Sequence, residues 1–187
     1  METRTITLDT PDGPMPAFGT LPDGATRGAV VVVQEAVGVD DRQIGIVGVC
    51  LGGRVTFLVA GHEALGAGVG SYGGGTVTAR SEAVPALTGP IAGVRTPWPG
   101  LSGDVDGSIP VEDVEQLREG LHSTADVDTA IMRYPDADHG FHCDVRESFD
   151  EVAAADAWRR TLVWLEGHLA PTARGTPAGD GQLWAGS

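Results

Sequence analysis

Residues 44–53 have the sequence IGIVGVCLGG, and the rest of the chain is organised around this stretch. Its β-branched start is typical of a buried strand, and residues 54–60 have the composition of a helix. Cys50 lies between Gly48 and Gly52, which is the spacing of a nucleophile elbow on a strained strand-to-helix turn. At both glycines we expect a side chain to collide with neighbouring backbone. The helix N-terminus favours a thiolate, and the alternative is a structural cysteine buried at a strand end.

Composition excludes several classes of protein. The 187-residue chain is 41% hydrophobic and 20% charged, as globular proteins are. Its formal net charge of -14, with no lysine, argues against a nucleic-acid partner. Two cysteines do not make a disulfide framework, the N-terminus lacks the apolar core of a signal peptide, and no apolar run is long enough to span a membrane. We therefore expect a cytoplasmic protein with no membrane partner.

The hydrophobic pattern predicts an α/β fold with a mainly parallel sheet flanked by helices. Residues 1–169 are expected to form one domain, and the Gly- and Pro-rich tail 170–187 to be disordered. An N-terminal hairpin is predicted from residues 3–8 and 15–20, and residues 76–95 are expected to be mostly loop. Further strands are predicted at 29–34, 44–49, 66–72, 97–102 and 128–134, and helices at 54–60, 110–121 and 147–169. The last helix is expected to bury Phe149, Val152, Leu162, Leu165 and Leu169.

Four chemically useful side chains follow predicted strands: Glu35, Cys50, Asp106 and His139. In parallel α/β sheets, reactive groups gather at the carboxyl ends of strands, so we expect these side chains to lie together. The order of nucleophile, acid and histidine along the chain is that of the α/β-hydrolases.

Each of these residues also has a structural interpretation. His139 fits a loop histidine with a structural hydrogen bond, and Glu35 fits a solvated carboxylate. Asp104 and Asp106 share one turn and suit turn formation. Asp106 is favoured because a helix is predicted to begin just after it. A metal site is not expected, because no common zinc pattern matches the spacing of His139, His142, Cys143 and Asp144.

Five stretches carry motifs of one known family: QEAVGV at 34–39, GIVGVCLGG at 45–53, YGG at 72–74, GDVDGSIP at 103–110 and YPDADHGF at 134–141. They resemble the motifs of the dienelactone hydrolase family, the cysteine-dependent branch of the α/β-hydrolase superfamily. The resemblance covers nearly all of residues 1–169. It implies a Cys50–His139–Asp106 triad with Glu35 beside the thiol.

Two departures from the family pattern stand out. The family carries a helix, a strand and a helix where this chain has only residues 38–44, so one strand and its flanking helices are expected to be missing after the third strand. Uncovered apolar sheet of this kind favours self-association. The family also holds a substrate carboxylate with two arginines. One would lie in the missing segment, and Cys143 replaces the other, with Arg146 close by. Arg146 is therefore a candidate substrate-binding residue, and Tyr72 of the YGG stretch is a second candidate.

The resemblance implies hydrolysis of a small ester or lactone, as by carboxymethylenebutenolidase, through a covalent thioester at Cys50. The backbone N–H groups of Leu51 and Ala36 would bind the oxyanion. No metal or organic cofactor is expected. Two alternatives remain: a non-catalytic or poorly folded remnant of such an enzyme, and a cysteine-dependent acyl transferase or redox-responsive protein.

Overall fold

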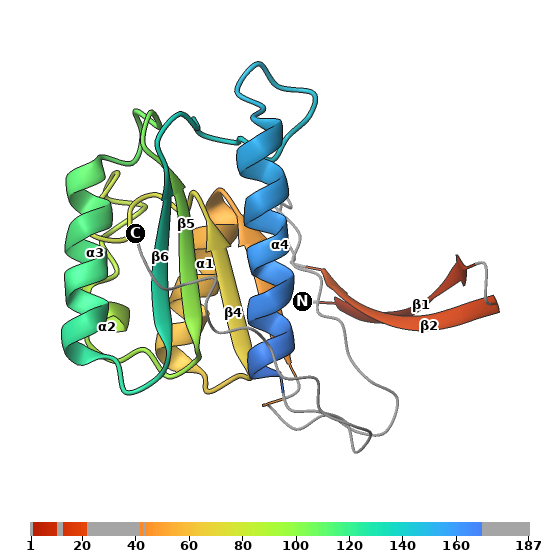
Figure 1. Cartoon of the computed structure of the whole chain (residues 1–187). Coiled ribbons are helices and arrows are strands. Elements are labelled where there is room, and N and C mark those ends of the chain that lie inside the picture. Colours follow the sequence, from red (N-terminus) through yellow and green to blue (C-terminus); the bar gives the residue numbers. More distant parts are fainter. Residues whose placement is uncertain (1, 11–12, 22–41, 43, 170–187) are drawn as a thin grey trace.

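A four-stranded parallel sheet in the order β3-β4-β5-β6 forms the centre of the molecule (Figure 1). The computed structural model describes residues 2–10, 13–21, 42 and 44–169. The sheet strands are β3 (Gly45–Val49), β4 (Ala67–Ser71), β5 (Trp98–Gly103) and β6 (Thr129–Tyr134). The helices are α1 (Leu51–His62), α2 (Thr88–Ile91), α3 (Val111–Thr124) and α4 (Glu151–His168). This alternation confirms the predicted α/β class.

The N-terminal hairpin is confirmed as a separate two-stranded antiparallel sheet. Strand β1 (Glu2–Thr10) pairs with β2 (Gly13–Leu21) in a register that joins Thr10 to Gly13. The strand expected at residues 29–34 and the tail from residue 170 lie outside the described residues.

Helices cover both faces of the parallel sheet (Figure 1). Helix α4 packs on β4 from one side, while α1 packs on β3 and β4 from the other. Helices α1, α2 and α3 contact one another in sequence, and α3 also packs on β6. Each strand of the parallel sheet therefore delivers its carboxyl end to one edge, where the loops that follow β3, β5 and β6 can meet.

Part of the core lies between α1 and the sheet. Phe57 is fully buried and its ring lies 4.7 Å from that of Trp98, centroid to centroid. The indole N–H of Trp98 donates to the hydroxyl of Thr56 at 3.1 Å, so the buried polar atom of the tryptophan is satisfied. Burying a phenylalanine side chain contributes about 1.5–3 kcal/mol, and this contact fixes α1 on β5.

Residues 76–95, expected to be mostly loop, contain the short helix α2 and one isolated bridge between Ser81 and Val84. The guanidinium of Arg54 on α1 is buried and donates to the backbone carbonyls of Gly75 and Pro85. Arg54 thus holds residues 76–95 against α1 through hydrogen bonds to backbone carbonyls. Hydrophobic periodicity could not predict this contact, because it depends on a polar side chain.

Helix α4 corrects the prediction of which residues it buries. It begins at Glu151, not 147, because Asp150 caps it by accepting the backbone N–H of Ala153 at 2.9 Å. Its buried side chains are Ala153, Ala157, Thr161 and Trp164. Phe149, Val152 and Leu162 are exposed, and Leu165 and Leu169 are only partly buried.

The physical reason for this difference is the surface that α4 covers. Strand β4, which α4 contacts, has the sequence AGVGS and carries little side-chain bulk. Three of the four buried residues of the helix are small, and Trp164 is the large one. Apolar size alone therefore did not identify the buried positions, because it took no account of the surface that the helix packs against.

Helix α3 confirms the helix predicted at 110–121 but ends three residues later, at Thr124. Val114, Leu117 and Leu121 are buried along one face, and Val111 is only partly buried. Pro110 takes the N-cap position, just before the first helical residue, so α3 begins at Val111.

Candidate active site

A sharp turn between β3 and α1 presents Cys50 to solvent. Its backbone has φ 55° and ψ -123°, a conformation that few non-glycine residues adopt. The N–H of Cys50 donates to the carbonyl of Ser71 at the end of β4, at 3.0 Å. The thiol therefore stands at the N-terminus of α1 on a strained residue held by the neighbouring strand, which is the geometry of a nucleophile elbow.

The glycines around Cys50 are only partly as predicted. A side chain at Gly48 would place its Cβ 2.2 Å from the carbonyl oxygen of Gly52, so the expected collision is present there. At Gly52 the expectation was wrong, since an added Cβ would meet nothing within 4 Å. Gly53 is the second constrained position, because its Cβ would lie 2.5 Å from the carbonyl oxygen of Ser71. The turn brings the residue after Gly52, not Gly52 itself, against β4.

A hydrogen-bonded chain runs from Cys50 through His139 to Asp106. His139 Nε2 lies 3.1 Å from Cys50 Sγ, and His139 Nδ1 lies 2.7 Å from Asp106 Oδ2. The Asp106 side chain is 1% exposed, whereas that of His139 is 25% exposed. The carboxylate is thus shielded from water and the imidazole faces the open side, where a substrate can reach it.

The two aspartates of the turn after β5 have different partners. Asp104 pairs with Arg133 on β6 through both carboxylate oxygens, at 2.7 and 2.8 Å, while Asp106 contacts His139. Asp106, which the sequence favoured, is therefore the aspartate that contacts the histidine, whereas Asp104 forms an ion pair with Arg133. Arg133 also donates to Glu115 on α3 at 2.8 Å. These bonds and that from Arg118 lower the pKa of Glu115, although partial burial opposes its ionisation.

The loops that carry Asp106 and His139 are joined by backbone hydrogen bonds. The N–H of Asp104 donates to the carbonyl of Tyr134 at 2.9 Å, and that of Val105 donates to the carbonyl of Ala137 at 3.2 Å. The separation of the carboxylate and the imidazole is therefore set by the main chain as well as by their own contact.

Ser108 is a site residue that sequence reasoning missed. Its hydroxyl donates to Asp106 Oδ1 at 2.6 Å and its backbone N–H donates to the same oxygen at 2.8 Å. The hydroxyl oxygen also lies 3.3 Å from His139 Nδ1. An Asp-x-Ser sequence at a turn is a signal for such bonds, because aspartate side chains often accept the N–H two residues on.

Tyr72, a predicted substrate-binding residue, is 3% exposed and packs beneath the histidine loop. Its ring contacts those of His139 and Phe141 edge-on, each at 5.1 Å between centroids. Burial, with the nearby Cys50 and Cys143, raises the pKa of Tyr72 to about 12, although Arg146 and the backbone of His142 oppose this shift. Tyr72 therefore supports the loop of His139 as a neutral phenol.

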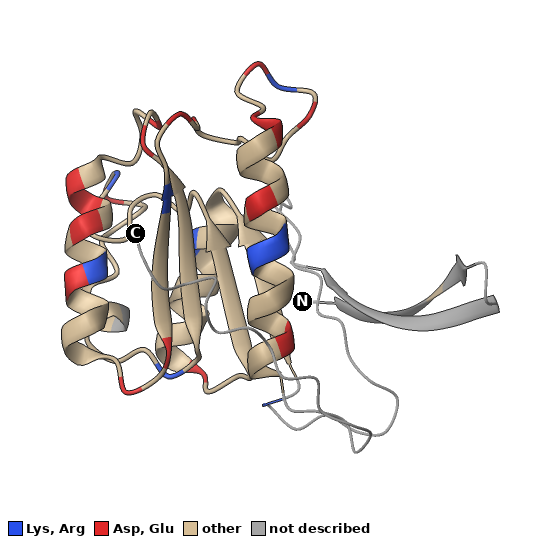
Figure 2. Cartoon of the chain, in the orientation of Figure 1, with Lys and Arg blue, Asp and Glu red and all other residues tan. Residues whose placement is uncertain are grey.

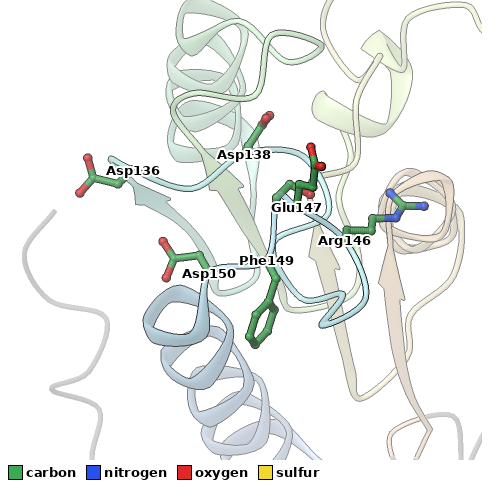
Figure 3. A pocket seen from close by; sticks show the side chains of 7 residues that line it. Asp136, Asp138, Arg146, Glu147, Phe149 and Asp150 are labelled. Carbon is green, nitrogen blue, oxygen red and sulfur yellow. The ribbon is translucent and has the colours of Figure 1, made fainter.

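Arg146, the other predicted substrate-binding residue, lies over the loop that follows His139. Its guanidinium is close enough to Gly140 that an added Cβ there would stand 3.0 Å from Nη1. It lines a surface hollow in which it extends away from Asp136 and Asp150 (Figure 3). The hollow is lined by Asp136, Asp138, Arg146, Glu147, Ser148, Phe149 and Asp150. Arg146 is thus the one cation in a mostly acidic lining.

The remaining predicted residues divide into two groups. Leu51, whose backbone N–H is a predicted oxyanion donor, is the first residue of α1 and directly follows Cys50. Glu35 and Ala36 lie outside the described residues.

Acidic residues outnumber arginines on α3, on α4 and in the loop before α4 (Figure 2). Among the described residues, no three His, Cys, Asp or Glu side chains gather closely enough to hold a metal ion. Within the same part of the chain, no helix is both long and apolar enough to cross a bilayer.

Comparison with known proteins gives consistent matches. The model of the dienelactone hydrolase family matches residues 39–169. The chain is 37% identical over 130 residues to the "Putative carboxymethylenebutenolidase" of Escherichia coli strain K12, covering 69% of this chain and 48% of that protein. It is 28% identical over 152 residues to the "Probable 2-oxo-3-(5-oxofuran-2-ylidene)propanoate lactonase" of Bradyrhizobium sp., covering 75% and 57%.

A solved structure agrees with these matches. The crystal structure of a "Putative Dienelactone Hydrolase" from Klebsiella pneumoniae subsp. pneumoniae MGH 78578 superposes with a TM-score of 0.62 at 38% identity, covering 69% of this chain and 54% of that one. The chain spans about half the length of the curated relatives it matches, as the 48% of the Escherichia coli protein illustrates.

Proposed function

The chain belongs to the dienelactone hydrolase family, and we propose that it hydrolyses a small ester or lactone through a thioester at Cys50. The observation that carries this proposal is the chain of hydrogen bonds from the Cys50 thiol through both nitrogens of His139 to the buried Asp106. A thiol, a base and an orienting carboxylate in this order form the general arrangement of an activated nucleophile.

In the acylation step, His139 Nε2 takes the proton of the Cys50 thiol, and the thiolate attacks the carbonyl carbon of the ester. A C–S bond forms and the carbonyl oxygen becomes an oxyanion. The N-terminus of α1 favours both negative charges. When the tetrahedral intermediate collapses, the C–O bond breaks and the alkoxide takes the proton from His139.

The backbone N–H of Leu51 is the proposed oxyanion donor on the described side of the site, and such a donor is worth about 3 kcal/mol. The partner donor is Ala36, and Glu35 is proposed to help activate the thiol. Both lie outside the described residues, so their parts in the proposal rest on the QEAVGV motif alone.

In the deacylation step, His139 takes a proton from water and the resulting hydroxide attacks the thioester carbonyl. The C–S bond breaks, and the acid product leaves with the thiolate restored. Asp106 keeps Nδ1 protonated throughout, since its Oδ2 accepts that N–H at 2.7 Å, and it stabilises the imidazolium formed in each step.

Arg146 is the proposed contact for a negatively charged or strongly polar part of the substrate. Its guanidinium lies beside Gly140, the residue after His139, so it can reach a group bound next to the imidazole. A family member named as a lactonase suggests lactones among the compounds to test.

The test is a panel of small esters and lactones, with and without a carboxylate, assayed on the wild-type protein and on Cys50→Ala. Cys143→Ala is the matched control, because it removes the only other thiol of the chain. We expect hydrolysis by the wild type and Cys143→Ala and none by Cys50→Ala. Hydrolysis that survives in Cys50→Ala, or a wild type inert on the whole panel, would contradict the proposal. Turnover that requires an added acyl acceptor would indicate a transferase.

A further inference from the structure

Ser108 holds the carboxylate oxygen that His139 does not use. Asp106 Oδ2 faces His139 Nδ1, and Asp106 Oδ1 accepts both the hydroxyl and the backbone N–H of Ser108, at 2.6 and 2.8 Å. Both oxygens of a side chain that is 1% exposed are therefore satisfied, one by the histidine and one by the serine.

The local sequence fixes this arrangement. Residues 106–108 read Asp-Gly-Ser, and the side chain of the first accepts the N–H of the third, which closes a side-chain turn. The N–H of Ile109 then donates to the main-chain carbonyl of Asp106 at 3.0 Å, and Pro110 caps α3. The serine is thus tied to the start of a helix and cannot move away from the carboxylate without breaking the turn.

We propose that the Ser108 hydroxyl is a positioning group for the reaction, which holds the Asp106 carboxylate in the plane that aims Oδ2 at His139 Nδ1. This inference rests on the proposed function, because it assigns a role within the same set of residues. The hydroxyl oxygen stands 3.3 Å from Nδ1, so it also closes the side of the imidazole through which a water molecule would compete for that N–H.

A purely structural role predicts something different. The backbone N–H of residue 108 closes the turn by itself, so the turn survives when the hydroxyl is removed. The hydroxyl is an additional donor to a buried charge, and hydrogen bonds to charged acceptors are stronger than neutral ones. Its loss is therefore expected to loosen the carboxylate while leaving the fold in place.

The first measurement compares variants of Ser108 in ester hydrolysis. Ser108→Ala is expected to lower kcat about fivefold, the effect of one hydrogen bond, with KM unchanged and only a small decrease in Tm. Ser108→Thr keeps the hydroxyl, and its kcat is expected to stay within about twofold of the wild-type value. Valine has the shape of threonine but no hydroxyl, so the kcat of Ser108→Val should fall as that of Ser108→Ala does. Ser123→Ala is the control, since that exposed hydroxyl bonds only to the Gly120 carbonyl on α3.

The second measurement needs no ester and separates this inference from the proposed function. The rate of Cys50 alkylation by iodoacetamide is followed against pH, with peptide mapping to exclude Cys143. Without the hydroxyl the Asp106 carboxylate beside the imidazole loses one donor and part of its orientation, so the curve for Ser108→Ala and Ser108→Val should differ from that of the wild type, while Ser108→Thr should overlay it.

Curves for Ser108→Ala and Ser108→Val that coincide with the wild-type curve, or a Ser108→Thr curve displaced as far as theirs, overturn the proposal even if esters are hydrolysed. A shifted curve in a protein that hydrolyses no ester supports the role of Ser108 and refutes the proposed function. If Ser108→Ala does not fold, the pair Ser108→Thr and Ser108→Val carries the same comparison.

Discussion

The two halves of the site are held in place by different means. Cys50 is positioned by the main chain: a strained residue, two glycines pressed against backbone and one hydrogen bond to β4. Asp106 and His139 are positioned by side chains in addition to the main chain, through Ser108, Tyr72 and the ion pairs of the neighbouring turn. The turn of Cys50 tolerates little added side-chain volume, but it needs no particular side chain besides the thiol. The arrangement of Asp106 and His139 depends on several individual side-chain contacts.

The largest effect should come from breaking the backbone half. Gly48→Ala forces a Cβ to within 2.2 Å of the Gly52 carbonyl oxygen, so we expect a loss of more than about 3 kcal/mol in the free energy of unfolding. Gly52→Ala is the matched control, because its Cβ meets nothing within 4 Å, and we expect its stability to be unchanged or raised by up to about 1 kcal/mol. Thermal and urea unfolding measure both. Equal losses would show that the turn is not as described.

The next effect concerns the side-chain half. Asp106→Asn removes the carboxylate that lies 2.7 Å from His139 Nδ1 and that we propose orients the imidazole. We expect a loss of about 10²–10³ in kcat, less than the 10⁴ of a serine protease because a thiolate needs less help from a base. Asp104→Asn should cost less than about tenfold, since Asp104 contacts Arg133 and not His139. Steady-state kinetics on an ester decide between them. The account fails here if Asp104→Asn is the more damaging variant.

A smaller effect is expected from the ion pairs that brace the loop of Asp106. Arg133 joins Asp104 to Glu115, while Arg118 reaches only Glu115 and the Ile131 carbonyl. These groups are about one-fifth to two-fifths exposed, so solvent screening limits Arg133→Gln to a loss of about 1–2 kcal/mol in unfolding free energy. The loss of unfolding free energy in Arg118→Gln should be smaller. Urea unfolding tests this order, and a larger loss for Arg118→Gln would contradict it.

The smallest effect is a dependence of stability on pH. Burial lowers the pKa of His142, whose ring packs on Phe141. In the unfolded chain His142 takes up a proton near the ordinary histidine pKa of 6.5, whereas in the folded chain it does so only at lower pH. The contribution of His142 to stability is therefore complete above about pH 6.5 and is lost as the pH falls below that value. We expect the Tm to decrease between about pH 7.5 and pH 5.5.

His142→Gln should reduce that decrease in Tm, while His122→Gln, on the exposed last turn of α3, should not. Differential scanning calorimetry at the two pH values measures both variants. An identical decrease in His142→Gln would mean that other groups cause it.

The same contrast explains what could be predicted from the sequence. The sharp turn at Cys50 was predicted from residues 44–53 alone, because such a local turn requires glycines at a fixed spacing in the sequence. Gly52 was nevertheless chosen in place of Gly53, since the contact partner is β4, which lies elsewhere in the chain. Asp106 was favoured over Asp104 by its place before a helix. That Arg133 on β6 holds Asp104 is a tertiary fact without a local signal.

Larger misses had the same origin. The buried positions of α4 were assigned to large apolar residues, although three of the four are the small Ala153, Ala157 and Thr161. Ser108 was missed because a serine in a turn is ordinary until the histidine is placed beside it. The self-association expected from uncovered sheet depends on a segment outside the described residues and stays a prediction.

The most direct test of the central claim, that the elbow and the hydrogen-bonded chain make Cys50 the nucleophile, is the intact mass of the protein during turnover. An activated ester is mixed with the protein, the reaction is quenched with acid, and the acylated peptide is mapped. The account predicts one acyl group per chain, attached to Cys50 and absent in Cys50→Ala, which accumulates in Asp106→Asn because hydrolysis of the thioester is slowed. An acyl group on another residue, or ester turnover with no adduct on Cys50 in either protein, would contradict it.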